Sequence, residues 1–315
     1  MIQCSVSESG VPTGLRHMLY PYKGEQQYLS GTLAYIDHAR TGGGSIVVAA
    51  PEPRRRFLRE HLPDDGSVSF VDTDALGRNP GRLIPAWQEW IGQSAQNGPV
   101  HGINESVWSG RTSPHQSELR YHEWLLNLAF AGAPAWSLMC PYDTAGQAAA
   151  TVEALARCHP LVWNGAAHVA GSDYDRGPYR FEPLTEPSEP YDQVPYASGD
   201  LHSLRTRVSK RAKAAGLKPQ RVRDLLLAVT EIATNSIRHG GGSGKLHLWT
   251  VEDALVCELR DSGYIADPLA GRVRPAPKQL GGRGLWFVHQ TCDLVEIRST
   301  RQEGTRVRLH MYLDA

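Results

Sequence analysis

Apolar and polar positions in the first part of the chain alternate between two periods. Short apolar runs typical of buried strands are separated by longer stretches whose apolar residues recur at helical spacing. The helical stretch 27–40 ends at a run of three glycines, and the apolar run Ser45–Ala50 follows directly. Such alternation predicts a doubly wound, mainly parallel α/β sheet. The expected strands cover residues 45–50, 68–71, 100–107 and 135–140, and the expected helices cover residues 27–40, 54–61, 83–93, 115–130 and 147–158.

The pattern changes after residue 200. Two amphipathic stretches, 201–215 and 220–239, come first, and strand-like alternation follows them. Helices followed by neighbouring strands predict an α+β sandwich with a largely antiparallel sheet. Its expected strands cover residues 245–251, 254–260, 294–299 and 305–313, with one short helix at 285–291.

A proline-rich segment separates the two patterns. Residues 181–200 contain four prolines and several acidic residues, and they show no helical periodicity. Such a composition is typical of a linker. We therefore expect a first domain at residues 1–182, a linker at 183–200 and a second domain at 201–315.

Charge and cysteine content narrow the class of protein. The 33 basic and 33 acidic residues cancel, which argues against binding to nucleic acid through the overall field. A run of about 18 apolar residues, as a membrane span needs, is absent, and the first residues lack the pattern of a secretory signal. The five scattered cysteines form no CxxC pair, so we expect reduced thiols in a cytoplasmic protein.

The longest helix expected in the second domain carries two polar residues one turn apart. Glu231 and Asn235 are four positions apart and therefore share a helical face. An amide oxygen can bind Mg²⁺, which prefers oxygen ligands, and a carboxylate can orient or deprotonate a hydroxyl. Alone, this pair is also compatible with two solvated side chains.

Three further elements follow in order. Asp261 and Gly263 end a strand, where a carboxylate can accept the exocyclic amine of adenine and a glycine permits close approach or a positive φ. The run Gly281–Gly284 opens an expected helix, and backbone amides at a helix N-terminus beside a cation suit phosphates. Thr305 begins the last strand.

In their order and spacing, these four elements resemble the GHKL ATPase superfamily, and within it the anti-sigma-factor serine kinases. The resemblance covers residues 201–315. It implies a GHKL (Bergerat) sandwich that binds ATP with Mg²⁺. The roles that it implies are the Mg²⁺ ligand for Asn235, the catalytic base for Glu231, adenine binding for Asp261, Gly263 and Thr305, and closure on the triphosphate for Gly282, Arg283 and Gly284.

The sequence departs from this family at two places. Ile265 stands where many relatives have a second glycine, and the expected ATP lid, residues 264–280, carries three prolines. Two alternatives stay open: a non-catalytic module in which ATP only gates protein binding, and a sensor histidine kinase. The latter needs a phospho-accepting histidine on a helix directly before the ATPase module, whereas the His122-Glu123 pair lies far upstream in the α/β region.

Three motifs in the first domain carry a second resemblance. They are HxLYPY at residues 17–22, ExVWSGR at 105–111, and YHE at 121–123 with the later CPYD at 140–143. They resemble the MEDS sensory domain of the dichloromethane regulator and of methanogen sensors, over about residues 11–180. That family is thought to sense small, often hydrocarbon-like molecules on a RecA-like fold.

Without the resemblance, the residues of this domain indicate less about its function. A phosphate loop would need GxxxxGK[ST] after the strand 45–50, but the chain has APEPRRR, so ATP hydrolysis is not expected here. Its three arginines predict a solvated basic turn or an anion site. We expect a small-molecule pocket at the carboxyl ends of the strands. Its candidate residues are Glu105, Trp108, His122, Glu123 and Tyr142.

A metal site is a less favoured alternative in the same domain. It would need three or four converging ligands, which a sequence cannot display. The candidate ligands are His17, Glu105, Glu118, His122, Glu123, Cys140 and His159.

Together these patterns predict a cytoplasmic regulator. We expect an N-terminal sensor for a small molecule and a C-terminal serine/threonine kinase that phosphorylates an antagonist protein and sequesters a sigma factor. We expect no direct contact with nucleic acid or membrane, and a homodimer is left open.

Overall fold

The computed structural model describes residues 14–74, 76–94, 98–105, 112–133, 135–145, 147–187, 191–251, 253–276 and 282–313. The chain forms two compact units. The first unit runs up to Gly77 and continues over Leu83–Tyr179, and the second consists of Arg78–Arg82 and the chain from Arg180 onward. The five residues 78–82 thus belong with a domain that lies far away in the sequence.

The first unit is built on a sheet with strand order β3-β2-β4-β5-β1-β6-β7 among the described residues. All neighbouring strands are parallel except β6 and β7, which are antiparallel. The strands are β1 (Leu15–Tyr22), β2 (Ser45–Ala50), β3 (Val68–Asp72), β4 (Val100–Asn104), β5 (Trp136–Asp143), β6 (Leu161–Trp163) and β7 (His168–Ala170).

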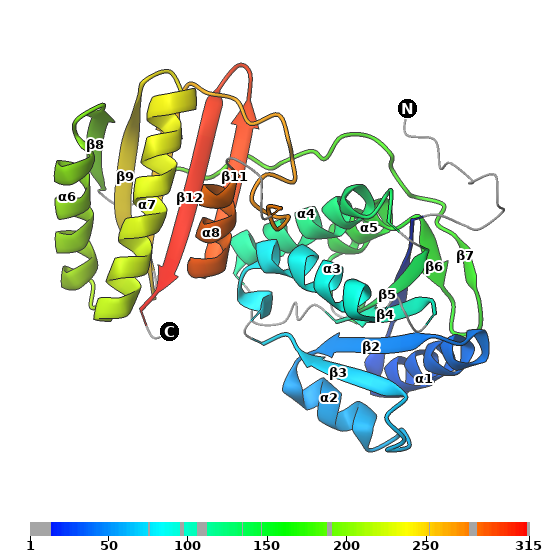
Figure 1. Cartoon of the computed structure of the whole chain (residues 1–315). Helices are drawn as coiled ribbons and strands as arrows, with labels where there is room; N and C mark the ends of the chain where they lie inside the picture. The colour runs from blue at the N-terminus through cyan, green and yellow to red at the C-terminus, as the bar shows by residue number, and fades with distance from the viewer. Residues whose placement is uncertain are drawn as a thin grey trace. The chain divides into compact units, whose positions relative to one another are not determined.

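Helices cover both faces of this sheet, α1 and α2 on one and α3, α4 and α5 on the other (Figure 1). The expected parallel-rich α/β architecture is therefore confirmed. The helices are α1 (Gly24–Gly42), α2 (Glu52–Arg59), α3 (Leu83–Ser94), α4 (Ser113–Ala129) and α5 (Ala149–Cys158). Strand β1 was not expected, although it lies between β5 and β6 inside the sheet. Its polar His17 and its Pro21 break the apolar run by which buried strands are recognised.

Tyrosines fill much of the core between β1 and α1. Tyr28 and Tyr35 of α1 are almost fully buried, and the ring of Tyr20 from β1 lies over Gly31. A β-carbon at Gly31 would come within 2.0 Å of the Tyr20 hydroxyl oxygen, so a glycine is required for this approach.

The second unit contains an antiparallel sheet of order β11-β12-β10-β9-β8 among the described residues. Helices α6, α7 and α8 lie on one face of it (Figure 1), and leucines, valines and alanines of both layers form the core between them. This is the expected α+β sandwich. The elements are β8 (Asp192–Ala197), α6 (Leu201–Ala214), α7 (Pro219–His239), β9 (Ser243–Val251), β10 (Ala254–Asp261), α8 (Arg283–Thr291), β11 (Leu294–Thr300) and β12 (Gly304–Tyr312).

Strand β8 corrects the expected linker. Residues 183–200 are not linker throughout, because β8 pairs with β9 and forms one edge of the sheet. Its Pro195 lacks a backbone donor, which an edge strand tolerates because only one side of the strand is hydrogen-bonded. Pro190 just before this short strand and Pro195 within it hide its alternating pattern from sequence analysis.

The opposite face of the second sheet carries buried charges. Glu258 of β10 is fully buried and accepts hydrogen bonds from Arg306 at 2.9 Å and from Arg308 at 2.8 Å. Glu296 of β11 is 2% exposed, and its Oε2 lies 2.9 Å from Nε2 of His310. Buried charges of this kind stabilise a fold only when they are paired, as they are here.

Residues 78–82 cap the C-terminus of α8. Asn79 donates to the carbonyl oxygens of His289 and Cys292 at 2.9 and 3.2 Å, and the Arg82 guanidinium donates to the same two oxygens. The last carbonyl oxygens of a helix have no N–H donor within the helix, so the donors of Asn79 and Arg82 satisfy them. This contact explains why the segment belongs to the second unit.

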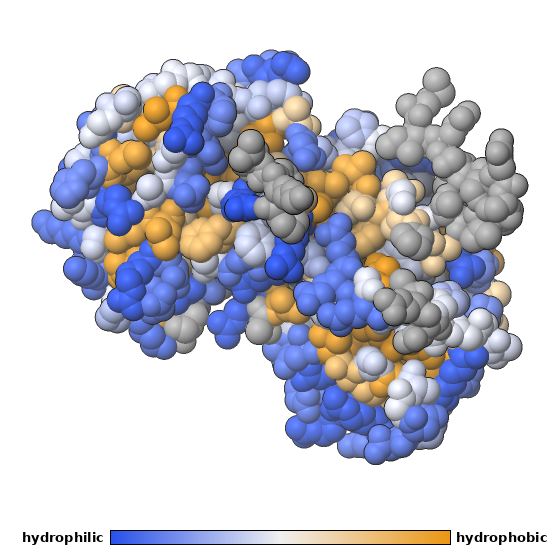
Figure 2. Space-filling view, viewed as in Figure 1, coloured by the Kyte–Doolittle hydropathy of each residue, from blue (hydrophilic) through white to orange (hydrophobic). Residues whose placement is uncertain are grey.

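Hydrophilic residues cover most of the visible surface over α2 (Figure 2), in keeping with its several arginines. Of the helices in the part of the chain that the structure describes, none is both long and apolar enough to cross a bilayer.

Candidate functional site

A cavity of about 670 Å³ opens in the second unit. Its wall comes from the second half of α7, the end of β10, the start of β12, the segment after β10 and the first turn of α8. Six of the residues predicted from sequence line it together, which are Asn235, Asp261, Gly263, Gly282, Gly284 and Thr305.

Asp261 is held in place by two hydrogen bonds. Its Oδ1 accepts from the backbone N–H of Gly263 at 2.8 Å, and its Oδ2 accepts from the Ser236 hydroxyl at 2.6 Å. The Tyr196 hydroxyl donates to Ser236 at 2.9 Å. Burial raises the pKa of Tyr196 to about 12, with the Asp261 charge adding to the rise and the Ser236 bond opposing it, so the phenol remains a donor. The carboxylate is therefore fixed and keeps acceptor capacity for a ligand.

Close backbone packing surrounds this carboxylate. A β-carbon at Gly240 would lie 2.4 Å from Cγ of Asp261, and one at Gly263 would lie 2.8 Å from the Cα of Gly240. Of the two reasons expected for a glycine at position 263, the structure supports close approach, because Gly263 is not among the glycines with positive φ.

Thr305 joins the strand end to the same wall. Its hydroxyl donates to the Gly263 carbonyl oxygen at 2.9 Å and lies 2.7 Å from the Ser299 hydroxyl. Ser299 in turn accepts from the N–H of Ile265 at 2.8 Å. Ile265, the departure noted in the sequence, therefore lines the cavity with its backbone tied to β11.

Glu231 and Asn235 lie one turn apart on α7, as their spacing predicts. Asn235 lines the cavity, whereas Glu231 is exposed beside it. A β-carbon at Gly284 would lie 2.6 Å from Oε2 of Glu231, so the glycine segment that opens α8 runs against this carboxylate. The structure thus places Glu231 next to the end of the cavity that α8 closes.

The start of α8 has the geometry that favours an anion. Gly282 precedes the helix in the left-handed region, with φ 79°, and no side chain caps it. The first N–H groups of a helix have no intrahelical acceptor and carry partial positive charge. Arg283 begins α8 but does not line the cavity, and Gly281 lies outside the described residues.

Sequence analysis missed several residues of this wall. Ser236 and Tyr196 orient Asp261, while His239, Tyr264 and Arg274 line the cavity. Ser236 directly follows Asn235, on the buried side of α7, and a hydroxyl among apolar helix positions is the signal that could have indicated it.

The predicted sensor residues of the first unit fall into two groups. The Tyr142 hydroxyl donates to Oε1 of Glu123 at 2.6 Å, so these two residues meet in the core. Glu105, in contrast, accepts from the Tyr28 hydroxyl at 2.7 Å and pairs with Arg54 at 2.9 Å. Burial raises the pKa of Glu105, while Arg54 and Tyr28 oppose the rise.

The remaining two predicted residues are His122 and Trp108. His122 is buried on α4 next to Glu123. Trp108 lies outside the described residues.

The arginines that follow β2 are not simply solvated. Arg54 pairs with Glu105, and Arg55 is buried between Glu52 and Asp72, at 2.5 and 3.0 Å. Only Arg56 of the three is exposed. Helix α2 thus uses two of its arginines in ion pairs rather than in a bare basic turn.

Comparison with known families assigns both halves of the chain. Residues 16–160 match the MEDS family, the methanogen/methylotroph, DcmR sensory domain. Residues 194–311 match the histidine kinase-like ATPase domain. No curated protein matches the chain. The chain therefore has an N-terminal MEDS domain and a C-terminal histidine kinase-like ATPase domain, and the latter implies ATP binding and a kinase or ATPase class of activity. The match to the ATPase domain begins within β8, which agrees with the place of that strand in the second sheet.

Proposed function

We propose that the protein is an ATP-dependent serine/threonine kinase of the anti-sigma-factor type, regulated by a small-molecule sensor. The C-terminal domain would transfer the γ-phosphoryl group of ATP to a hydroxyl of an antagonist protein, and would also hold a sigma factor. The observation that carries this proposal is the place of Glu231, an exposed carboxylate beside the cavity and against the glycine segment that opens α8.

Adenine binds at the Asp261 end in this proposal. The fixed carboxylate accepts the exocyclic amine, and Thr305 keeps the neighbouring Gly263 backbone in place. Guanine carries a carbonyl oxygen where adenine carries this amine, and this oxygen would face the Asp261 carboxylate, which is also an acceptor. Selectivity for ATP over GTP follows, since an unpaired buried polar group costs about 1–3 kcal/mol.

The residues fit a magnesium ion that arrives with the nucleotide. Asn235 lines the same cavity as Asp261 and Gly284, and its side chain offers an amide oxygen, the donor type that Mg²⁺ prefers. Bound there, the ion would neutralise charge on the phosphates. The N-terminus of α8 and the left-handed Gly282 also favour the triphosphate.

Glu231 supplies what a kinase needs and a binding module does not. A serine or threonine hydroxyl is a poor nucleophile near neutral pH, so a carboxylate that orients it and accepts its proton speeds transfer. Because Glu231 is exposed, a segment of a partner protein can reach it. A pure ATP-gated binder has no use for a base at this position.

The histidine kinase alternative has less support. Such an enzyme needs a helical segment with the accepting histidine directly before the ATPase domain. Between α5 and α6, the described residues form strands β6, β7 and β8 and extended chain, without a helix.

The proposal is tested with radiolabelled ATP, the full chain and candidate antagonist proteins, followed by acid treatment of the products. Phosphoserine and phosphothreonine survive acid, whereas phosphohistidine does not. We expect acid-stable label on the antagonist, a fall of roughly 10²-fold in Glu231→Gln, and nearly unchanged ATP binding.

A matched control lies on the same helix. Asp224→Asn makes the same change of carboxylate to amide, seven residues or about 10 Å earlier on α7, and it should transfer phosphate at the wild-type rate. Acid-labile label on the chain itself would restore the histidine kinase alternative. If wild type transfers no label and Glu231→Gln still binds a sigma factor, the ATP-gated binder is the better account.

A further inference from the structure

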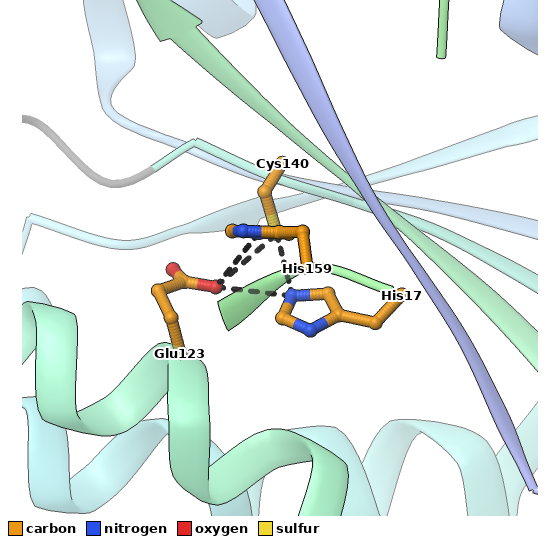
Figure 3. A group of neighbouring side chains, drawn as sticks. All are labelled: His17, Glu123, Cys140 and His159. Carbon is orange, nitrogen blue, oxygen red and sulfur yellow. Dashed lines mark hydrogen bonds and ion pairs between the residues drawn. The ribbon is translucent and has the colours of Figure 1, made fainter. Parts of the chain in front are cut away.

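Four side chains that are far apart in the sequence meet in the core of the first unit (Figure 3). They are His17 from β1, Glu123 from α4, Cys140 from β5 and His159, which follows α5. All four are fully buried, and their potential ligand atoms lie within 4.8 Å of one another. Neither the ATP cavity nor any step of the proposed phosphoryl transfer involves them.

The tautomer of His17 is determined by its surroundings. The amide group of Asn127 donates to the carbonyl oxygen of Cys158 at 2.7 Å, which identifies its other atom as the oxygen. This oxygen lies 3.2 Å from Nδ1 of His17, so Nδ1 must carry the hydrogen. The Nε2 atom of His17 therefore faces the cluster, 3.1 Å from Oε2 of Glu123.

His159 repeats this arrangement. Its Nδ1 lies 2.7 Å from the carbonyl oxygen of Leu155, which can only accept, so Nδ1 is again the donor. Its Nε2 then faces Oε2 of Glu123 at 3.4 Å and makes no hydrogen bond. Two imidazoles thus have their hydrogens on the outer nitrogens and turn their inner nitrogens to one carboxylate oxygen.

While Glu123 is ionised, no protonation state of the two rings satisfies this geometry. If both rings are neutral, two nitrogen lone pairs face an anionic oxygen. If both are protonated, two cations stand with ring centroids 4.1 Å apart in a fully buried place. If only one is protonated, the other lone pair still faces the carboxylate. A cation between the two Nε2 atoms and Oε2 of Glu123 removes the conflict, because all three atoms then become ligands of the cation.

We propose that His17, Glu123, Cys140 and His159 form a binding site for a divalent transition-metal ion, with zinc as the best-matched metal. The donors would be Nε2 of each histidine, Oε2 of Glu123 and the thiolate sulfur of Cys140, which releases its proton on binding. Nitrogen and sulfur donors select zinc and its neighbours over magnesium or calcium.

The spacing of the donor atoms fits a tetrahedral ion. Bonds of about 2.0–2.3 Å at tetrahedral angles separate ligand atoms by about 3.3–3.6 Å. In the structure, Nε2 of His17 lies 3.1 Å from Oε2 of Glu123, and Sγ of Cys140 lies 3.4 and 3.5 Å from these two atoms. All pairs of donor atoms lie within 4.8 Å, so movements of about 1 Å would bring the four donors to tetrahedral spacing.

A second layer of hydrogen bonds orients the donors, as is usual at metal sites. Asn127 holds His17, the Leu155 carbonyl holds His159, and the Tyr142 hydroxyl binds Oε1 of Glu123, the oxygen that does not face the other donors. Four protein donors fill a tetrahedron, so the ion would join β1, α4, β5 and the end of α5 rather than bind substrate.

The site is tested on the full chain, purified without a histidine tag and dialysed free of metal. We expect binding of about one zinc ion per chain, as one tetrahedral site requires, measured by mass spectrometry of the metal content. Cobalt(II) should bind in its place and give an absorption band from thiolate-to-cobalt charge transfer. Cys140→Ser should remove this band, and Asn127→Ala should weaken zinc binding by roughly 10–100-fold.

Cys257→Ser is the matched control, since Cys257 is equally buried but belongs to the core of the second unit. It should keep the cobalt band. Binding of ATP by each variant reports folding of the second domain, and circular dichroism reports the whole chain. A folded wild type without zinc binding and without the cobalt band overturns the proposal, and so does a band that survives in Cys140→Ser. If Cys140→Ser does not fold, the cobalt spectrum of wild type and the zinc affinity of Asn127→Ala decide whether the site exists.

Discussion

The backbone of Gly284 lies directly against the carboxylate of Glu231, leaving no room for a β-carbon at the glycine. Gly284 lies in the first turn of α8 and Glu231 lies in α7, and the two helices are neighbours in the second unit. Their contact couples the segment expected to close on the triphosphate to the residue proposed as the base. The position of the carboxylate therefore depends on the absence of a side chain at Gly284, far later in the chain.

Gly284→Ala should displace the Glu231 carboxylate without unfolding the domain. The added β-carbon would meet the far end of a flexible side chain, which can move away. Displacing a catalytic group by about 1 Å can cost 10²-fold in rate, so we expect phosphoryl transfer to fall by that order while ATP binding changes less. Gly92→Ala is the control, because nothing lies within 4 Å of a β-carbon there. Transfer at the wild-type rate in Gly284→Ala would contradict the coupling.

Asn235→Ala should weaken the magnesium-dependent part of ATP binding. The variant removes the amide oxygen that lines the cavity and leaves the adenine end unchanged. Titrations of ATP with magnesium and with EDTA separate the two parts. Equal ATP affinity for wild type and variant under both conditions would remove Asn235 from the role of ligand.

Asp261→Asn should reduce the preference for ATP over GTP. The amide would place a donor where one carboxylate oxygen now accepts from Gly263 or from Ser236. We expect ATP affinity to fall by about 10-fold or more, the scale of an unsatisfied buried polar group. Competition of GTP against a labelled ATP analogue measures the preference, and an unchanged preference would contradict the adenine assignment.

Ser236→Ala tests a residue that orients Asp261 at the same site. It removes the donor to Oδ2 of Asp261 and also the acceptor for Tyr196. We expect ATP affinity to fall less than in Asp261→Asn, because the Gly263 bond still orients the carboxylate. A larger loss than in Asp261→Asn would show that Ser236 acts in some other way.

Glu296→Gln should lower stability in a pH-dependent manner. Burial raises the pKa of Glu296, but the hydrogen bond from His310 and the charges of His310, Arg308 and Arg298 outweigh it and hold the pKa below its usual range. A depressed folded-state pKa contributes stability above the unfolded value of about 4.3, and this contribution is lost as the pH falls through the folded value. At pH 7 we expect a loss of about 3 kcal/mol in the free energy of unfolding, the scale of a broken buried pair.

Urea titrations at pH 7 and below pH 4 measure this difference. Hydrogen exchange of the backbone amides in β11 and β12 is a second readout of the same loss. The gap between wild type and Glu296→Gln should shrink on acidification. Glu303→Gln, at an exposed carboxylate, is the control and should stay within about 0.5 kcal/mol of wild type. A gap that is constant with pH would exclude the ionised Glu296 as its source.

Much of this protein could be predicted from the sequence because helices and strands impose their periods locally. The four-residue spacing of Glu231 and Asn235 is enough to place them on one helical face, and the run Ser45–Ala50 is recognisable as a buried strand wherever it lies. The order of helices and strands likewise predicted a parallel-rich sheet followed by an antiparallel sandwich. These features depend on neighbours in the chain, and a sequence displays its neighbours directly.

The remaining features depend on which distant strands become neighbours. Strands β1 and β8 have weak patterns of their own and are stabilised by pairing with β5 and β9. Of the seven candidate metal ligands, the sequence could not separate the four that meet from the three that do not, because His17 and Cys140 meet only when β1 pairs with β5. The sequence alone thus determined the elements and their local faces. Only the tertiary structure decided which faces converge, since strand order and register arise from packing of the whole domain.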